Sequence, residues 1–211
     1  MPTNATALPW SGPLRLALLG AAVATFCDAM HVHTQTLSYP QPYMFGQAVF
    51  VFPGFFGAFL IMGGAYRLLV RYLPRAVARA VSTSPGDQRE LTESLVSFAL
   101  VYLLSAFGNR EPVLLSYLFY ATALLRLTVT SERGFMTLLA LILALFGILA
   151  EGTMTVLDLV RYREPEIYGV PVWLGGLYMH GAFALRAGMR WFVYREAGPV
   201  ARKKNGGGGG I

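Results

Sequence analysis

The few ionisable side chains inside the apolar stretches of this 211-residue chain are its candidates for chemistry. Asp28 and His31 are three residues apart, so on a helix they would share one face. Glu151 lies at a similar depth in a later apolar stretch, and the two carboxyl groups could therefore face one site. Charged groups in hydrocarbon are costly, so their presence indicates a binding site or an ion pathway.

Three kinds of site are open to these residues. A metal site would join both acids to the histidines His31, His33 and His180, because imidazole and carboxylate suit iron or zinc, but the sequence lacks the paired Glu-x-x-His repeat of di-iron bundles. A proton or ion relay could use Asp28 and Glu151, although no polar chain continues to the opposite surface and no inverted repeat is evident. The third is a pocket with a polar cap inside an apolar bundle.

A pocket with carboxylates would select its ligand by charge. Carboxylates accept hydrogen bonds from hydroxyl groups and repel phosphate, and no Arg or Lys cluster lies at the same depth. We therefore expect a neutral lipid, such as a diacylglycerol or a sterol, held without metal or other cofactor. The sequence shows no Ser-His-Asp spacing, nucleophile elbow or phosphate loop. Non-enzymatic lipid binding is the leading prediction, and a small proton- or ion-coupled transporter using Asp28 and Glu151 is the alternative.

The stretches that must position these acids are typical of membrane helices. Between Leu16 and Tyr66 the only ionised side chain is Asp28, and a helix needs about 20 apolar residues to cross hydrocarbon. The mean hydropathy of +0.51 and the charged fraction of 13% agree with this interpretation. We predict an all-α polytopic membrane fold with six transmembrane helices that enclose a lipid cavity, and we expect Pro53 to kink the second helix. The expected spans are residues 14–34, 43–73, 91–108, 112–130, 134–157 and 167–186.

The basic residues predict how the spans are oriented. With both termini cytoplasmic, 14 of the 17 Lys and Arg residues fall on the cytoplasmic side, and only Arg110, Arg161 and Arg163 fall outside, as the positive-inside rule requires. The net charge of +6 therefore reflects topology, and we expect no nucleic-acid partner. We assign residues 1–205 to a single membrane domain and the glycine-rich residues 206–211 to a linker or cloning remnant.

Several motifs, in order, resemble the insulin-induced-gene (Insig) family of membrane proteins. Asp28-Ala-Met-His31-Val-His33, followed by Tyr39-Pro40, is similar to the family's Asn-x-x-Gln-x-Gln string and the aromatic-Pro pair behind it. Residues 128–134 are similar to its Ser/Arg-rich turn ending in Gly, and residues 164–166 and 173–190 to its Ser-Pro-Asp motif and Gly-rich last span. The resemblance covers most of the chain.

The resemblance implies a non-catalytic protein whose six helices enclose a lipid cavity. Members of the family bind oxysterols there and hold a sterol-sensing partner protein through their third and fourth spans. On this chain the resemblance implies further cavity residues beside Asp28, His31 and Glu151, namely Phe98, Tyr102, Ser116 and Tyr120. Arg outnumbers Lys by 15 to 2, as in GC-rich bacterial genomes. We therefore expect an actinobacterial-type homologue in the bacterial cell membrane, or in the endoplasmic reticulum membrane if the chain is eukaryotic.

The third and fourth spans are short. Their uncharged runs have 16 residues (94–109) and 14 residues (112–125), and short spans can relieve hydrophobic mismatch by associating. We predict a homo-oligomer, a trimer, that forms through this pair of spans, and we leave open a membrane protein partner.

Overall fold

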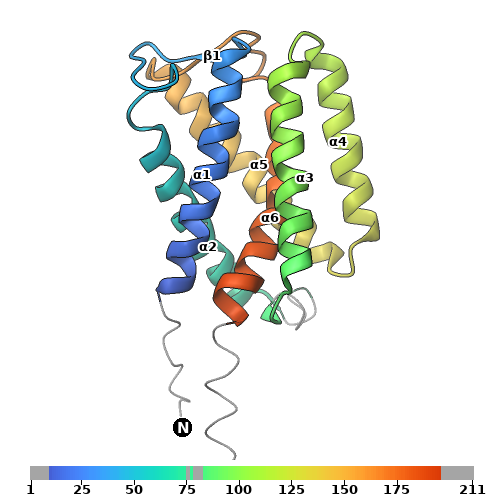
Figure 1. The fold of residues 1–211 in the computed structure, drawn as a ribbon. Coiled ribbons are helices and arrows are strands. Elements are labelled where there is room, and N and C mark those ends of the chain that lie inside the picture. Colours follow the sequence, from blue (N-terminus) through green and yellow to red (C-terminus); the bar gives the residue numbers. More distant parts are fainter. Residues whose placement is uncertain (1–9, 75–76, 78–82, 196–211) are drawn as a thin grey trace, which may run out of the picture.

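The computed structural model describes residues 10–74, 77 and 83–195, and its described part contains six helices that run along a common bundle (Figure 1). The all-α fold with six helices is therefore confirmed. Two short strands pair antiparallel, Leu37 with Tyr162 and Ser38 with Arg161. The elements are α1 (Ser11–His33), β1 (Leu37–Ser38), α2 (Val51–Tyr72), α3 (Gln88–Gly108), α4 (Pro112–Val129), α5 (Arg133–Val156), β2 (Arg161–Tyr162) and α6 (Trp173–Gly188), which continues as a π-helix (Met189–Tyr194).

Helices α1 to α5 are each long and apolar enough to cross a membrane. The α-helical part of α6 has only 16 residues, and the π-helix extends it. We call the end of the bundle with β1 and β2 the ribbon end and the opposite end, where α1 begins and the π-helix finishes, the terminal end (Figure 1). Of the residues assigned to the cytoplasmic side, Arg75, Arg79, Arg202, Lys203 and Lys204 lie outside the described residues, as does the tail 206–211.

Two predicted spans began too early. The second helix begins at Val51, and residues 43–50 form a loop in which Met44 and Gln47 make a bridge. Pro53 therefore lies in the first turn, where a missing N–H loses no intrahelical partner, and the expected kink was wrong. The last helix begins at Trp173, after a loop of the same kind.

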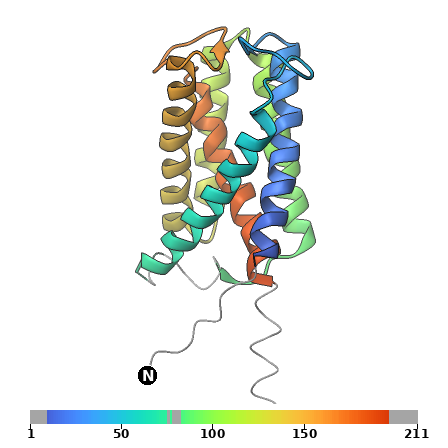
Figure 2. The same cartoon turned by 90° about the vertical axis from the view of Figure 1, so that its left-hand side faces the viewer.

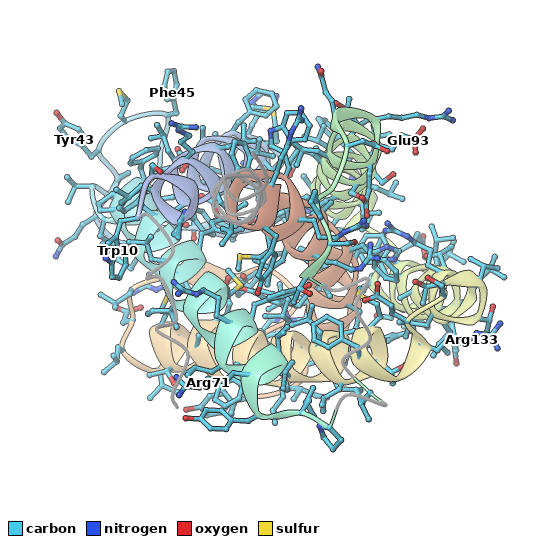
Figure 3. The ribbon with its side chains drawn as sticks, turned by 90° about the horizontal axis from the view of Figure 1, so that it is seen from below. Trp10, Tyr43, Phe45, Arg71, Glu93 and Arg133 are labelled. Atoms are coloured by element: carbon cyan, nitrogen blue, oxygen red, sulfur yellow. The ribbon has the colours of Figure 1, made fainter. Side chains whose placement is uncertain are left out.

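Helix α6 is the central helix. Eleven of its 16 residues are buried, it packs against α3, α4 and α5, and Figure 3 shows it surrounded by the other helices when seen from the terminal end. Gly175 and Gly176 lie directly against Tyr120 and Phe119 of α4. Small residues at these positions let the helix backbones approach closely, which is how membrane helices commonly pack.

At the ribbon end, the rings of His31 of α1 and Trp173 of α6 lie 6.0 Å apart, centre to centre. Helices α1 and α6 pack closely near the terminal end. There Gly12 lies against the backbone of Phe192, and Leu16 packs on Gly188. Toward the ribbon end the two helices diverge (Figure 2). We call the region between them the wedge. Side chains from α1, α3, α5, α6 and the ribbon fill it, and both candidate acids lie among them.

The hairpins α1–β1–α2 and α5–β2–α6 are two copies of one arrangement, offset by 123 positions. The repeat is visible in the backbone, because three pairs of equivalent loop residues share the left-handed conformation that favours glycine. Asp28 and Tyr39 of the first hairpin correspond to Glu151 and Tyr162 of the second. The three backbone pairs are Gln35 (φ 56°) and Asp158 (φ 54°), Phe45 (φ 54°) and Tyr168 (φ 50°), and Gly46 (φ 74°) and Gly169 (φ 80°).

Candidate functional site

Asp28 is held inside the protein by residues of its own hairpin. It lies on α1 with 3% of its surface exposed. The Tyr39 hydroxyl donates to its two carboxyl oxygens at 3.0 and 2.9 Å, and Gln47 Nε2 donates to Oδ2 at 2.7 Å. Gln47 also donates to the Thr25 carbonyl at 2.9 Å. The loop after β1 thus closes over Asp28 and supplies its two hydrogen-bond donors.

Glu151 holds the equivalent position on α5. The Tyr162 hydroxyl donates to its Oε2, and the Tyr178 hydroxyl of α6 donates to its Oε1, both at 2.9 Å. Unlike Asp28, Glu151 is only half-buried, as are both tyrosines. A carboxylate has about four acceptor positions, so Glu151 keeps capacity for hydrogen bonds from another molecule.

The charges of Asp28 and Glu151 both affect the pKa of Tyr39. Burial raises the pKa of Tyr39 far above its ordinary value, and the negative charges of Asp28 and Glu151 raise it further. Burial, followed by the charge of Glu151, does the same to the pKa of Tyr162. Both phenols are therefore neutral donors. The structure thus brings Asp28 and Glu151 into one group of polar side chains, the acid–tyrosine cluster: Asp28, Tyr39, Gln47, Glu151, Tyr162 and Tyr178.

His31 joins α1 to α3 beside this cluster. Its Nδ1 lies 2.9 Å from the Cys27 carbonyl, which can only accept, so we place the proton on Nδ1. Nε2 lies 2.8 Å from the Ser105 hydroxyl, which also donates to the Tyr102 carbonyl at 2.7 Å. The ring also lies 4.9 Å from that of Tyr102, centre to centre. These contacts of His31 hold α1 against α3.

The four side chains implied by the Insig resemblance divide into two pairs. Phe98 and Tyr102 of α3 are half-buried neighbours with ring centres 5.8 Å apart, and Tyr102 contacts His31 next to the cluster. Ser116 and Tyr120 of α4 use their hydroxyls on backbone carbonyls, of Pro112 at 2.8 Å and Val172 at 2.9 Å. No contact between described residues links this second pair to the acids.

Sequence reasoning found both acids but missed their partners, Tyr39, Gln47, Tyr162 and Tyr178. A signal was present, because an acid followed by a tyrosine eleven positions later occurs twice, as Asp28 with Tyr39 and Glu151 with Tyr162. Only the repeated loop and the pairing of β1 with β2 make that spacing meaningful.

The histidines do not support the metal alternative. His33 is exposed at the end of α1. His180 accepts at Nδ1 from Arg126 Nη1 at 3.0 Å, so its Nε2 carries the proton and faces the Phe119 carbonyl at 3.2 Å. Within the described residues, no three His, Cys, Asp or Glu side chains come together in a metal-ligating group.

The transporter alternative would need polar groups that continue from the acid–tyrosine cluster to the terminal end. Between the two lies an apolar core that includes the fully buried Tyr66, Phe135, Met136 and Met189. Beyond Arg126, which bonds to His180, further charged groups form an ion-pair network at the terminal end. There Arg186 pairs with the buried Glu132 at 2.8 Å, and both Arg186 and Arg190 pair with Glu90, at 2.6 and 2.5 Å. This network joins α3, α6 and the α4–α5 turn, so its charges support the fold.

Comparison with known proteins gives a family and a fold. A family model described as "Protein of unknown function (DUF2878)" matches residues 92–200. The structure is similar to that of MvINS, a mycobacterial Insig homologue from Mycobacterium vanbaalenii, with 21% identity and a TM-score of 0.71, over 92% of this chain and 99% of that one. It is also similar to a cross-linked trimer of an MvINS cysteine variant, with 20% identity and a TM-score of 0.69, over 88% and 96% of the two chains.

No curated protein matches the chain. The Insig-like fold expected from the sequence motifs is confirmed by the two structural matches.

Proposed function

Because the chain belongs to the family described as protein of unknown function (DUF2878) and has the polytopic membrane fold of an Insig homologue, we propose that it holds a neutral lipid in the wedge and has no enzymatic activity. The lipid is a diacylglycerol- or sterol-like molecule whose hydroxyl group reaches the acid–tyrosine cluster. The observation that carries this proposal is the half-buried Glu151, which accepts two hydrogen bonds from the part of the chain that the structure describes.

The two acids have different parts in this proposal. Asp28 already accepts from Tyr39 and Gln47 and fixes the loop that covers the wedge. Glu151 accepts the hydrogen bond of the lipid hydroxyl, and Tyr102 and Phe98 offer aromatic surface below it. A phosphate group would meet two carboxyl groups here, and repulsion would exclude it.

We place the protein in a bacterial cell membrane with the terminal end cytoplasmic, as the distribution of Arg and Lys favours. We also propose a homotrimer formed through α3 and α4, since the related MvINS has been crystallised as a cross-linked trimer. The outward face of α4 offers exposed apolar side chains for that contact: Val113, Leu114, Tyr117, Leu118, Leu124 and Leu125.

Mass spectrometry of lipids extracted from the purified protein tests the lipid proposal. We expect a neutral lipid at about one molecule per chain, and Glu151→Gln should reduce its retention severalfold because the anionic acceptor is lost. Glu164→Gln is the matched control, since Glu164 is an exposed acid at the same end. Absence of a neutral lipid from the wild-type protein, or equal retention by the Glu151 variant, would refute the proposal.

A further inference from the structure

We propose that a second, cationic pocket at the ribbon end binds the phosphate-bearing head group of an anionic phospholipid. The pocket lies where the end of α1 meets the α3–α4 turn, and its volume is about 490 Å³. His33, Thr34 and Phe107 form part of its wall, and Arg110 and Arg163 bring two guanidinium groups to it. It does not include any residue of the acid–tyrosine cluster, so the inference stands independently of the proposed neutral lipid.

Charge favours a phosphate in this pocket. Guanidinium groups present several donors in one plane and bind phosphate oxygens in pairs. One donor of Arg163, Nη2, bonds to the Thr34 carbonyl at the C-terminal end of α1, where a cation is stabilised. That bond holds the group at the pocket and leaves its other donors available. Glu111 and Glu164 follow the two arginines in sequence, but the described residues that line the pocket include no carboxylate.

Position favours a lipid over a soluble anion. The pocket lies at the level where α1 and α3 end and α4 begins, which is the head-group level for helices that span a membrane. Phe107 in its wall is 62% exposed, and Leu104 and Leu100, one and two turns earlier on α3, are also exposed. This apolar stripe gives acyl chains a surface directly below the arginines.

Two hydrogen-bonded contacts with α3, one from α1 and one from the loop after it, separate the pocket from the wedge. His31 is bonded to Ser105 at 2.8 Å, and Thr36 Oγ1 donates to the Ala106 carbonyl at 2.9 Å. The protein therefore presents two sites of opposite charge near one membrane surface. The acids would repel a phosphate group, whereas the arginines would bind it.

Lipid titration of the purified protein, followed by native mass spectrometry, tests this inference with phosphatidylglycerol and diacylglycerol as probes. Arg110→Gln should weaken phosphatidylglycerol binding about threefold to tenfold, and the additional change Arg163→Gln should weaken it further. Diacylglycerol retention should not change. Arg161→Gln is the matched control, because Arg161 is an exposed arginine of the same surface that pairs with Asp158.

Three results would overturn the inference. Unchanged phosphatidylglycerol binding in Arg110→Gln is the first, and this variant decides the matter alone if the double variant does not fold, since Arg110 has no hydrogen bond or ion pair to the described residues. An equal loss in Arg161→Gln would show a general surface-charge effect. Displacement of phosphatidylglycerol by inorganic phosphate at the same concentration would show that the pocket binds a soluble anion.

Discussion

Replacing Tyr39 by phenylalanine should destabilise the protein by removing a hydroxyl that bonds to both oxygens of Asp28. Asp28 is 3% exposed, so water cannot replace the lost donor, and only Gln47 remains. The hydroxyl has one proton, so the change removes one hydrogen bond, which contributes about 1 kcal/mol to a neutral acid and up to about 3 kcal/mol to a carboxylate.

For a chain of this size, that loss of unfolding free energy corresponds to a fall in Tm of between about 3 and 10 °C. Thermal unfolding in detergent, followed by tryptophan fluorescence, measures the fall. Tyr43→Phe is a matched control, because Tyr43 belongs to the same loop, is 76% exposed and points away from the bundle (Figure 3). Its Tm should equal that of the wild type.

A second comparison tests the different burial of the two acids. Tyr162→Phe also removes one hydrogen bond to a carboxyl group, but Glu151 is half-buried and can find another donor. Its Tm should therefore fall less than that of Tyr39→Phe. A larger fall for Tyr162→Phe, or no fall for Tyr39→Phe, would refute the view that Asp28 is the closed site and Glu151 the open one.

Two further changes test the packing of the bundle. Glu132→Gln should lower the free energy of unfolding by about 3 kcal/mol, because it leaves the largely buried Arg186 with one carboxylate fewer. Glu93→Gln removes an exposed ion pair and should change the free energy of unfolding by less than about 1 kcal/mol. Denaturant titration compares the two variants, and equal effects would contradict the argument from burial. Gly176→Val should lower Tm and weaken the packing of α4 on α6, because a Cβ at this position would lie 2.7 Å from Phe119. As a control, Gly57→Ala places its Cβ where no atom lies within 4 Å, so its Tm should be equal to or higher than that of the wild type. An unchanged Tm for Gly176→Val would show that α4 can shift.

Much of the fold could be predicted because hydrocarbon imposes a simple rule. Long charge-free runs located the helices. The arginine clusters at their ends predicted that both termini lie on the cytoplasmic side of the membrane. The starts of α2 and α6 could not be predicted in the same way. Residues 43–50 and 167–172 are as apolar as the helices they precede, and hydropathy does not distinguish a membrane helix from an apolar loop with Phe45 and Tyr168 in the left-handed conformation.

The sequence identified two of the six residues in the acid–tyrosine cluster, Asp28 and Glu151. Asp28 and Glu151 were identifiable because an acid in an apolar run has few explanations. Their hydroxyl partners were not, because Tyr39 and Tyr162 lie in segments between the helices, and hydropathy does not show that these segments fold back onto the acids. Ser116 and Tyr120 were chosen by resemblance to a family, and here the Ser116 hydroxyl bonds to a carbonyl of its own helix and the Tyr120 hydroxyl to the Val172 carbonyl that precedes α6.

The two copies of the repeated hairpin hold their acids in different ways. One copy buries its acid beneath the loop after β1, whereas the acid of the other copy has one more methylene and is partly exposed. Natural variation among related chains should therefore preserve the residues around Asp28 and be concentrated around Glu151, where side chains can change without disturbing the loops at the ribbon end.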